Sequence, residues 1–422
     1  MKHLRHITSV LVIVLIAVLA AGTIVEKLHG SDFARSHVYG AWWFVALWAV
    51  FAILVAVLTF RNPNWKRPVT LTLFLSVACI LLGALLTMLT GQHGRMKLEP
   101  NRPISHFFVK ENDGITKEAL PFSLTLDHFE IETYPDSPKP KDYISHLQIT
   151  DGNTLTETTI SMNNILKHRG YRFYQSDYDD KGNSILDVAH DPWGIAVTYA
   201  GYALLFVSLV TLIARPSLRG LDCRASLAMT QSENQPCPSL RGTKQSTNRI
   251  VTFSWLSVLV VLMVVLHIRM LTRPLMPVLR SPLFSVHIST IVTAYALLLG
   301  IAVVGIIAVV KRIVEPSNQV CLERLQNIST AMLYPAVALL AAGIFIGAVW
   351  ANISWGNYWS WDPKEVWALI TLLIYALPLF PNVLPSFRKP MFFHIYGILA
   401  ILSVVITYFG VNLILGGIHA YN

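Results

Sequence analysis

The chain has 422 residues, of which 54% are hydrophobic and only 14% charged. Soluble proteins carry about 25% charged residues, so this composition excludes a soluble enzyme or regulatory protein. The formal net charge of +9 is spread mainly over the connections between apolar runs. This distribution favours anionic lipid headgroups over nucleic acid as the charged partner.

Long apolar runs predict a helical membrane protein, since about 20 apolar residues span a bilayer as a helix. We predict nine transmembrane helices, at residues 7–25, 41–60, 69–89, 193–214, 250–271, 286–310, 330–350, 366–380 and 391–414. Lys and Arg gather at the N-terminus and in every second connection, so the positive-inside rule places that side in the cytoplasm. The first run is expected to be an uncleaved anchor; a signal peptide ending near Ala20 is the alternative.

Residues 91–192 form the one large polar segment and fall on the outer side. Segments 122–132, 145–150 and 171–175 alternate apolar and polar residues, which is typical of half-buried strands. The expected fold class is therefore an all-α polytopic membrane protein with about nine transmembrane helices and one small β-rich extracytoplasmic domain.

Residues 217–249 are polar and without period, and the tetrapeptide Ser217-Leu-Arg-Gly returns at Ser239. Such a composition predicts a flexible cytoplasmic linker between two modules.

The four cysteines include no C-x-x-C pair and none lies in the outer segment. Neither a structural disulfide nor a dithiol redox centre is indicated.

Five tryptophans lie within the eighteen residues from Trp350 to Trp367. An interfacial aromatic belt is the alternative reading, and it suffices for Trp350 at the end of a span. It does not explain the Gly, Asn, Asp and Pro residues woven between the others. We interpret the segment from Trp355 to Asp362 as a shaped loop whose indole faces pack on a large planar ligand.

Two histidines are expected on the same side as this loop. His287 begins the sixth predicted span, and His419 lies three residues from the C-terminal Asn422. A lone histidine at a span end is usually an interfacial residue, but two beside an indole-rich loop fit an axial pair for haem iron. Zinc is the alternative metal, although two histidines without Cys or carboxylate partners make a poor zinc site.

The motif Trp355-Gly-Asn-Tyr-Trp-Ser-Trp-Asp resembles the "WWD" signature of the CcsA/ResC haem-handling proteins of cytochrome c biogenesis. The resemblance covers about 250–422, while residues 1–215 resemble the partner family ResB/CcsB. The chain thus looks like a fused CcsB–CcsA synthetase. Its implied domains are ResB-like helices at 1–90, the outer domain at 91–192, a fourth helix at 193–216, the linker at 217–249 and a CcsA/ResC-like domain at 250–422.

The resemblance implies roles for individual residues. His287 and His419 match the family's outer haem-ligating histidines. The haem platform would comprise Trp355, Trp359, Trp361 and Asp362, supported by Gly356, Asn357, Trp367 and His93. The family also places a histidine pair within the membrane, and here the chain departs from the pattern: one matching position holds Phe380, and the stretch that matches the other holds Met88 or His93. His394 is the spare candidate.

The resemblance implies a cytochrome c haem lyase or synthetase with b-type haem as ligand and substrate. Thioether bonds would join haem vinyl groups to the thiols of the CXXCH segment of apocytochrome c. The protein would then contribute positioning, and no catalytic residue is assigned separately. Membrane lipids and a thioredoxin-like thiol reductant are further expected partners, and nucleic acid is not expected.

The expected location is the bacterial inner (cytoplasmic) membrane, with the active face extracytoplasmic. Two alternative functions stay open: a haem transporter or chaperone without ligation activity, and a non-catalytic membrane scaffold.

Overall fold

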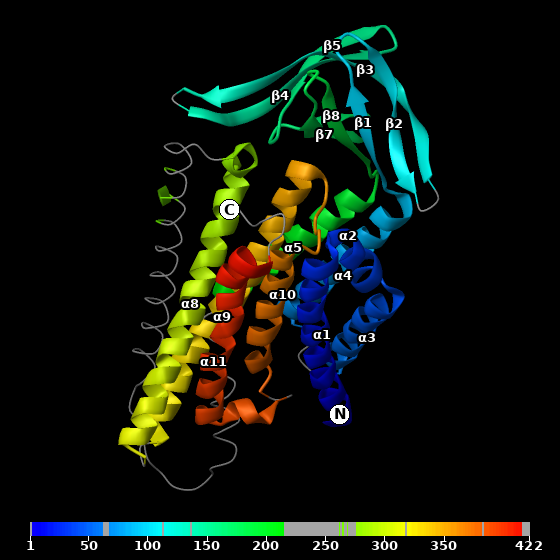
Figure 1. Ribbon diagram of the computed structural model, residues 1–422. Helices are drawn as coiled ribbons and strands as arrows, with labels where there is room; N and C mark the ends of the chain where they lie inside the picture. The colour runs from blue at the N-terminus through cyan, green and yellow to red at the C-terminus, as the bar shows by residue number, and fades with distance from the viewer. Residues whose placement is uncertain are drawn as a thin grey trace.

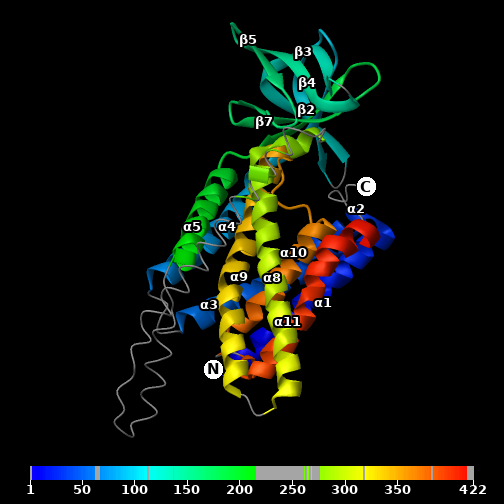
Figure 2. The same ribbon diagram turned by 90° about the vertical axis from the view of Figure 1, so that its left-hand side faces the viewer.

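A computed structural model places a bundle of long helices below a single β-sheet (Figure 1). The N-terminus lies at the end of the bundle away from the sheet in both views (Figures 1 and 2). The residues that the structure describes are 2–61, 67–111, 114–135, 137–214, 261, 264–265, 268, 276–316, 319–381 and 384–415.

The bundle contains eight long helices and several short helical turns among these residues. The long helices are α1 (Lys2–His29), α3 (Trp42–Phe60), α4 (Pro68–Thr90), α5 (Gly194–Ala214), α8 (Pro282–Val314), α9 (Gln319–Trp355), α10 (Pro363–Ala376) and α11 (Pro390–Val405). The π-helix η6 (Ile406–Leu415) continues α11. The short elements are α2 (Ser31–Ala34), η1 (Arg35–Tyr39), η3 (Pro277–Arg280), η4 (Leu377–Leu379) and η5 (Pro385–Arg388).

Seven helices in the described residues are long and apolar enough to cross a membrane. They correspond to seven of the nine predicted spans, and the chain is a multi-pass membrane protein. The predicted span at 366–380 corresponds to α10, which has only 14 residues. That is shorter than the about 20 residues that a span requires. The predicted span at 250–271 lies almost wholly outside the described residues, as does the predicted linker at 217–249.

Residues 92–190 fold as one antiparallel sheet of eight strands in the order β5-β4-β3-β2-β1-β8-β7-β6. The strands are β1 (Gln92–Leu98), β2 (Pro103–Glu111), β3 (Gly114–Tyr134), β4 (Ser137–Asp151), β5 (Thr154–Ile160), β6 (Leu166–His168), β7 (Tyr171–Tyr178) and β8 (Ser184–His190). The three strands expected from alternation are confirmed within β3, β4 and β7. Side chains from all eight strands enter one hydrophobic cluster, including the buried Leu124, Leu147 and Phe173.

The predicted fold class was wrong in its β part, because an eight-stranded sheet replaces the expected small domain. Alternation underestimates this sheet because several strands bury few side chains. Strand β5 buries only its last residue, Ile160, and its remaining positions are mostly exposed. Such a strand is held by backbone hydrogen bonds to its neighbour, and these leave no period-2 signal in the sequence.

Small residues let α4, which precedes the sheet in the chain, pack closely against α5, which follows the sheet. A Cβ atom added at Gly83 would clash with Thr198 Oγ1, and one added at Gly194 would clash with Thr87 Oγ1. Asp191 ties the same junction together. Its carboxylate accepts hydrogen bonds from Thr87 Oγ1 at 2.6 Å and from the Gly194 amide at 2.7 Å. Close helix contact of this kind is the usual route to packing in lipid.

We predict that Gly83→Val destabilises the protein while Ala84→Val does not. The first adds carbons against Thr198, whereas Ala84, the next residue of α4, is exposed. Overpacking of a tight contact costs about 1–3 kcal/mol. Thermal unfolding in detergent, followed by size-exclusion chromatography, measures the difference, and equal melting of the two variants would refute the packing assignment.

Candidate functional site

The Trp-rich segment forms the turn between α9 and α10. Helix α9 ends at Trp355, and Gly356 follows with φ of +84°, a conformation that glycine adopts without strain. Asn352 closes this end, since its Nδ2 donates to the Gly356 carbonyl at 3.0 Å. Asn357 is exposed at the tip of the turn. The turn is therefore a built loop rather than a frayed helix end.

Asp362 begins α10. Its Oδ1 accepts the Lys364 amide at 2.9 Å, and Pro363 occupies the first helical position. This is a standard N-cap with proline at the position where its missing N–H is harmless. Glu365 ties the loop back to the helix, since its Oε2 accepts from the Ser360 amide and hydroxyl. The sequence predicted that Asp362 contacts a ligand; the structure shows Asp362 as the N-cap of α10.

Trp361 has a backbone φ of +62°. A bulky residue with positive φ is strained and persists only where its surroundings hold it. The holding contact is Tyr39 of η1, whose ring stacks on Trp361 with centroids 4.7 Å apart and planes 7° apart. Phe44 of α3 adds an edge contact at 5.4 Å. One indole face of Trp361 is therefore taken by the N-terminal half of the chain.

Two further contacts join the loop to the N-terminal half. A side chain at Gly356 would meet the Tyr174 ring of β7 at 3.0 Å, so the sheet sits directly on the loop. Tyr358 lies edge-on to Tyr199 and Tyr202 of α5, with centroids about 6 Å apart. Burial raises the pKa of the Tyr358 phenol, and burial also raises the pKa of Tyr39. Both phenols therefore stay protonated at physiological pH.

The indole N–H groups of Trp367 and Trp359 differ in whether they have a hydrogen-bond partner among the described residues. Trp367 of α10 donates from Nε1 to Thr23 Oγ1 of α1 at 3.2 Å. Trp359 lies edge-on to Trp361, with ring centroids 5.9 Å apart. Its buried Nε1 has no hydrogen-bond partner among the described residues. A bound group with a hydrogen-bond acceptor at its edge would satisfy this buried indole N–H.

His287 lies in the first turns of α8 and faces α9. Its Nδ1 lies 2.7 Å from the Gly343 carbonyl oxygen. Because a carbonyl only accepts, Nδ1 carries the proton and Nε2 carries the lone pair. Gly347 makes the approach possible, since an added Cβ there would lie 2.7 Å from the imidazole. Metal-ligating histidines are commonly oriented in this way.

Trp350 connects His287 to the loop. It is only 2% exposed, its ring lies 6.5 Å from that of His287 and nearly parallel to it, and Trp355 packs on it edge-on. The interfacial-belt reading of Trp350 is therefore wrong. Sequence reasoning missed its role, together with those of Tyr39, Tyr174 and Tyr358. These residues carry no motif of their own and are recognised only by their contacts.

The remaining predicted site residues are found elsewhere in the chain. His419 lies outside the described residues. His93 is exposed near the start of β1, opposite Ala189 of β8. Met88 lies near the sheet end of α4, whereas Phe380 follows η4 beyond the far end of α10. His394 is buried near the start of α11.

A cavity of about 400 Å³ lies where the sheet meets α5, beside the loop. Arg172 of β7, Asp191 and Tyr199 are among its lining residues. The Tyr199 hydroxyl donates to Asn352 Oδ1 at 3.2 Å, so the cavity wall and the end of α9 are directly linked. This places a cation and a polar rim next to the aromatic loop.

We predict that the Tyr39–Trp361 stack is energetically coupled. Truncating either ring to Ala removes the same contact, so the double variant should lose less stability than the sum of the single variants. The expected coupling is about 0.5–1.5 kcal/mol. Thermal melting of the four proteins measures it. Tyr39→Phe serves as the control and should be near neutral, because the hydroxyl has no partner among the described residues; additive losses would contradict the stack.

Comparison with known proteins matches two separate parts of the chain. Residues 237–419 match the family described as "Cytochrome C assembly protein", and residues 64–192 match the ResB-like family. The His287 region, the aromatic loop and α10 fall in the first match, and the eight-stranded sheet falls in the second.

Individual relatives match shorter segments. Protein NrfI of Wolinella succinogenes is 36% identical over 151 residues, which is 35% of this chain and 17% of NrfI. Cytochrome c biogenesis protein CcsA of Pyropia yezoensis is 47% identical over 102 residues, 24% of this chain and 31% of that protein. CcsA of Guillardia theta is 33% identical over 173 residues, 35% of this chain and 56% of that protein. The chain thus spans from about a sixth to just over half of these relatives.

Proposed function

We propose that this chain is a cytochrome c biogenesis protein that joins a ResB-like region to a cytochrome c assembly region, and that it binds haem beside its aromatic loop and attaches it to apocytochrome c. The observation that carries the proposal is the His287 imidazole. Its proton is fixed on Nδ1 by the Gly343 carbonyl, so Nε2 is the nitrogen able to ligate iron.

The loop fits the edge of the same ligand. The Trp359 N–H is buried without a partner among the described residues, and the nearby cavity is lined by the cationic Arg172. Haem offers both a large apolar plane and two anionic propionates. A donor and a cation beside aromatic side chains match that combination.

His419 is the proposed second axial ligand. Asn412 of η6 precedes His419 in the chain, and the Asn412 Oδ1 accepts a hydrogen bond from Lys364 Nζ at 2.9 Å. Lys364 adjoins the cap of α10 and therefore the loop. Leu415 ends η6, and the four residue steps from Leu415 to His419 span at most about 13–14 Å. His419 is thus within reach of the loop.

The reaction needs little from protein side chains. Each CXXCH thiol adds across a haem vinyl double bond: the sulfur bonds to one carbon, the proton goes to the other, and nothing leaves. The role of this chain is to hold haem with its vinyl edge open and to seat the peptide beside it. Alignment of two reactants alone lowers a barrier by about 7–11 kcal/mol in ideal cases. A thioredoxin-like protein is proposed to keep the thiols reduced.

The sheet end is proposed to face outward from a bacterial inner membrane. Lys2 and Arg5 lie at the end of the bundle away from the sheet, where α1 begins. Lys311 and Arg312 lie in the last turn of α8, whose first turn lies near the sheet. Positive charge at one end of a bundle marks the cytoplasmic side.

Reconstitution tests the proposal. Purified protein, given reduced CXXCH peptide, should show a low-spin haem spectrum and yield peptide with covalently bound haem. Haem binding without ligation would favour a transporter or chaperone instead. Purification without haem, and failure to bind added haem, would favour a scaffold.

We predict that Gly347→Ala lowers haem occupancy at least about tenfold, equivalent to 1.4 kcal/mol. The added methyl displaces the His287 imidazole, and the expected spectral change should match that of His287→Gly. Added imidazole should restore the low-spin spectrum of His287→Gly. Gly300→Ala is the matched control, because its methyl meets only the flexible end of Met332. A normal spectrum in Gly347→Ala and His287→Gly would exclude His287 as a ligand.

A further inference from the structure

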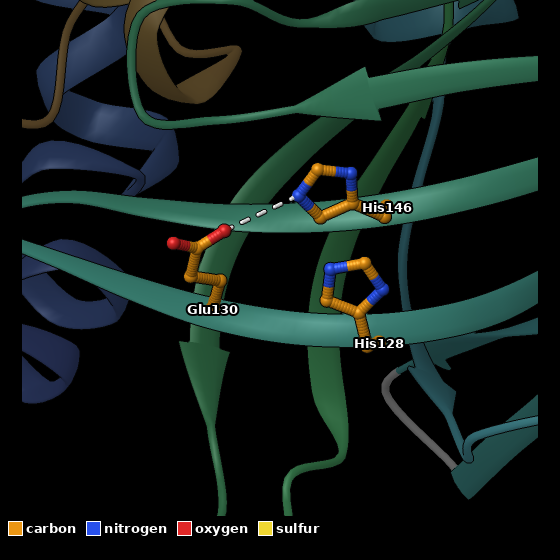
Figure 3. A group of neighbouring side chains, drawn as sticks. All are labelled: His128, Glu130 and His146. Carbon is orange, nitrogen blue, oxygen red and sulfur yellow. Dashed lines mark ion pairs between the residues drawn. The ribbon is translucent and has the colours of Figure 1, made fainter.

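Three side chains able to ligate a metal gather on the sheet, away from the aromatic loop. They are His128 and Glu130 of β3 and His146 of β4 (Figure 3). One ligand atom from each lies within 4.8 Å of the others. We propose that they form a binding site for a divalent first-row transition metal ion, with Zn²⁺ as the representative ion. This inference is independent of the proposed haem function.

Strand pairing brings the three residues together. His128 lies directly opposite His146 in the antiparallel pairing of β3 with β4. Glu130 lies two residues further along β3 and therefore on the same face as His128. The two imidazoles stack with centroids 4.1 Å apart and planes 12° apart. Backbone register, rather than chance approach of long side chains, thus sets the geometry.

A β-bulge immediately before His128 supplies an orienting group. The register shifts between Leu126 and His128, which leaves Asp127 as an extra residue. Its carboxylate lies 3.0 Å from His128 Nδ1. Since a carboxylate accepts, the proton sits on Nδ1 and the lone pair on Nε2. A carboxylate behind a histidine is the usual outer partner in zinc sites.

His146 presents the same ring nitrogen, Nε2, to this place. Its Nε2 lies 3.6 Å from Glu130 Oε2, which is too long for a hydrogen bond. That nitrogen is buried and has no hydrogen-bond partner among the described residues. Figure 3 shows one ring nitrogen of each histidine on the side where the Glu130 carboxylate lies. A cation bound there would satisfy all three groups.

The ligand set selects the class of ion. Two imidazoles and one carboxylate suit Zn²⁺, Cu²⁺ or Ni²⁺, whereas Mg²⁺ and Ca²⁺ prefer oxygen ligands only. Ligand atoms in a tetrahedral zinc site lie about 3.3 Å apart, given Zn–N bonds of about 2.0–2.1 Å. The exposed side chains of His128 and Glu130 can close the difference by rotation. Water would occupy the fourth position.

The test is a Zn²⁺ titration of the purified full-length protein in competition with a chromophoric chelator. Wild type should bind one Zn²⁺ that the variant His128→Asn/His146→Asn binds at least about 100-fold more weakly. Asp127→Asn should weaken binding about 10- to 100-fold through loss of the outer partner. His106→Asn is the control, since His106 lies on β2 outside the cluster, and it should leave the affinity unchanged.

Equal stoichiometry and affinity in wild type and in the double variant would overturn the site. Thermal melting without metal checks that the variants are folded. Should the double variant fail to fold, Glu130→Gln replaces one ligand with a side chain of the same shape. About tenfold or greater weakening there supports the site, and unchanged Zn²⁺ affinity overturns it.

Discussion

The stack of Tyr39 on Trp361 is the contact on which the rest of the arrangement depends. It joins the first hundred residues to the last hundred, and it holds Trp361 in a backbone conformation that a tryptophan would not adopt alone. Because Trp361 directly precedes the cap of α10, the position of that helix follows from the same contact. The N-terminal helices and the C-terminal helices of the chain are therefore interlocked at the loop rather than merely adjacent.

Local order in this protein was visible in the sequence, and long-range order was not. The alternation at Phe122, Leu124 and Leu126 predicted part of β3 because each apolar residue faces the sheet core. The loop after Trp355 was also recognisable, since glycine and a capping aspartate act on their nearest neighbours. Strand β5 escaped notice because its side chains are largely exposed, and α10 was overestimated because apolar composition continues into η4.

Contacts between distant residues required the structure. Nothing in the sequence pairs Tyr39 with Trp361, or Gly347 with His287, because each pair is joined only by packing across helices. The cluster on β3 and β4 was equally hidden. Its cross-strand register depends on one extra residue at Asp127, and a single-residue shift would place His128 on the opposite face. Local structure specified by one motif was predictable, and side-chain clusters assembled from several elements were not.

The Tyr39–Trp361 contact also sets an order of events during synthesis. Trp361 leaves the ribosome 322 residues after Tyr39, which at about 5–20 residues per second takes about 16–64 s. Throughout that interval Tyr39 of η1 and Phe44 of α3 have been synthesised but lack the Trp361 ring that packs on them. The loop therefore forms only after Trp361 has been synthesised, and so does any haem-binding site that requires the loop.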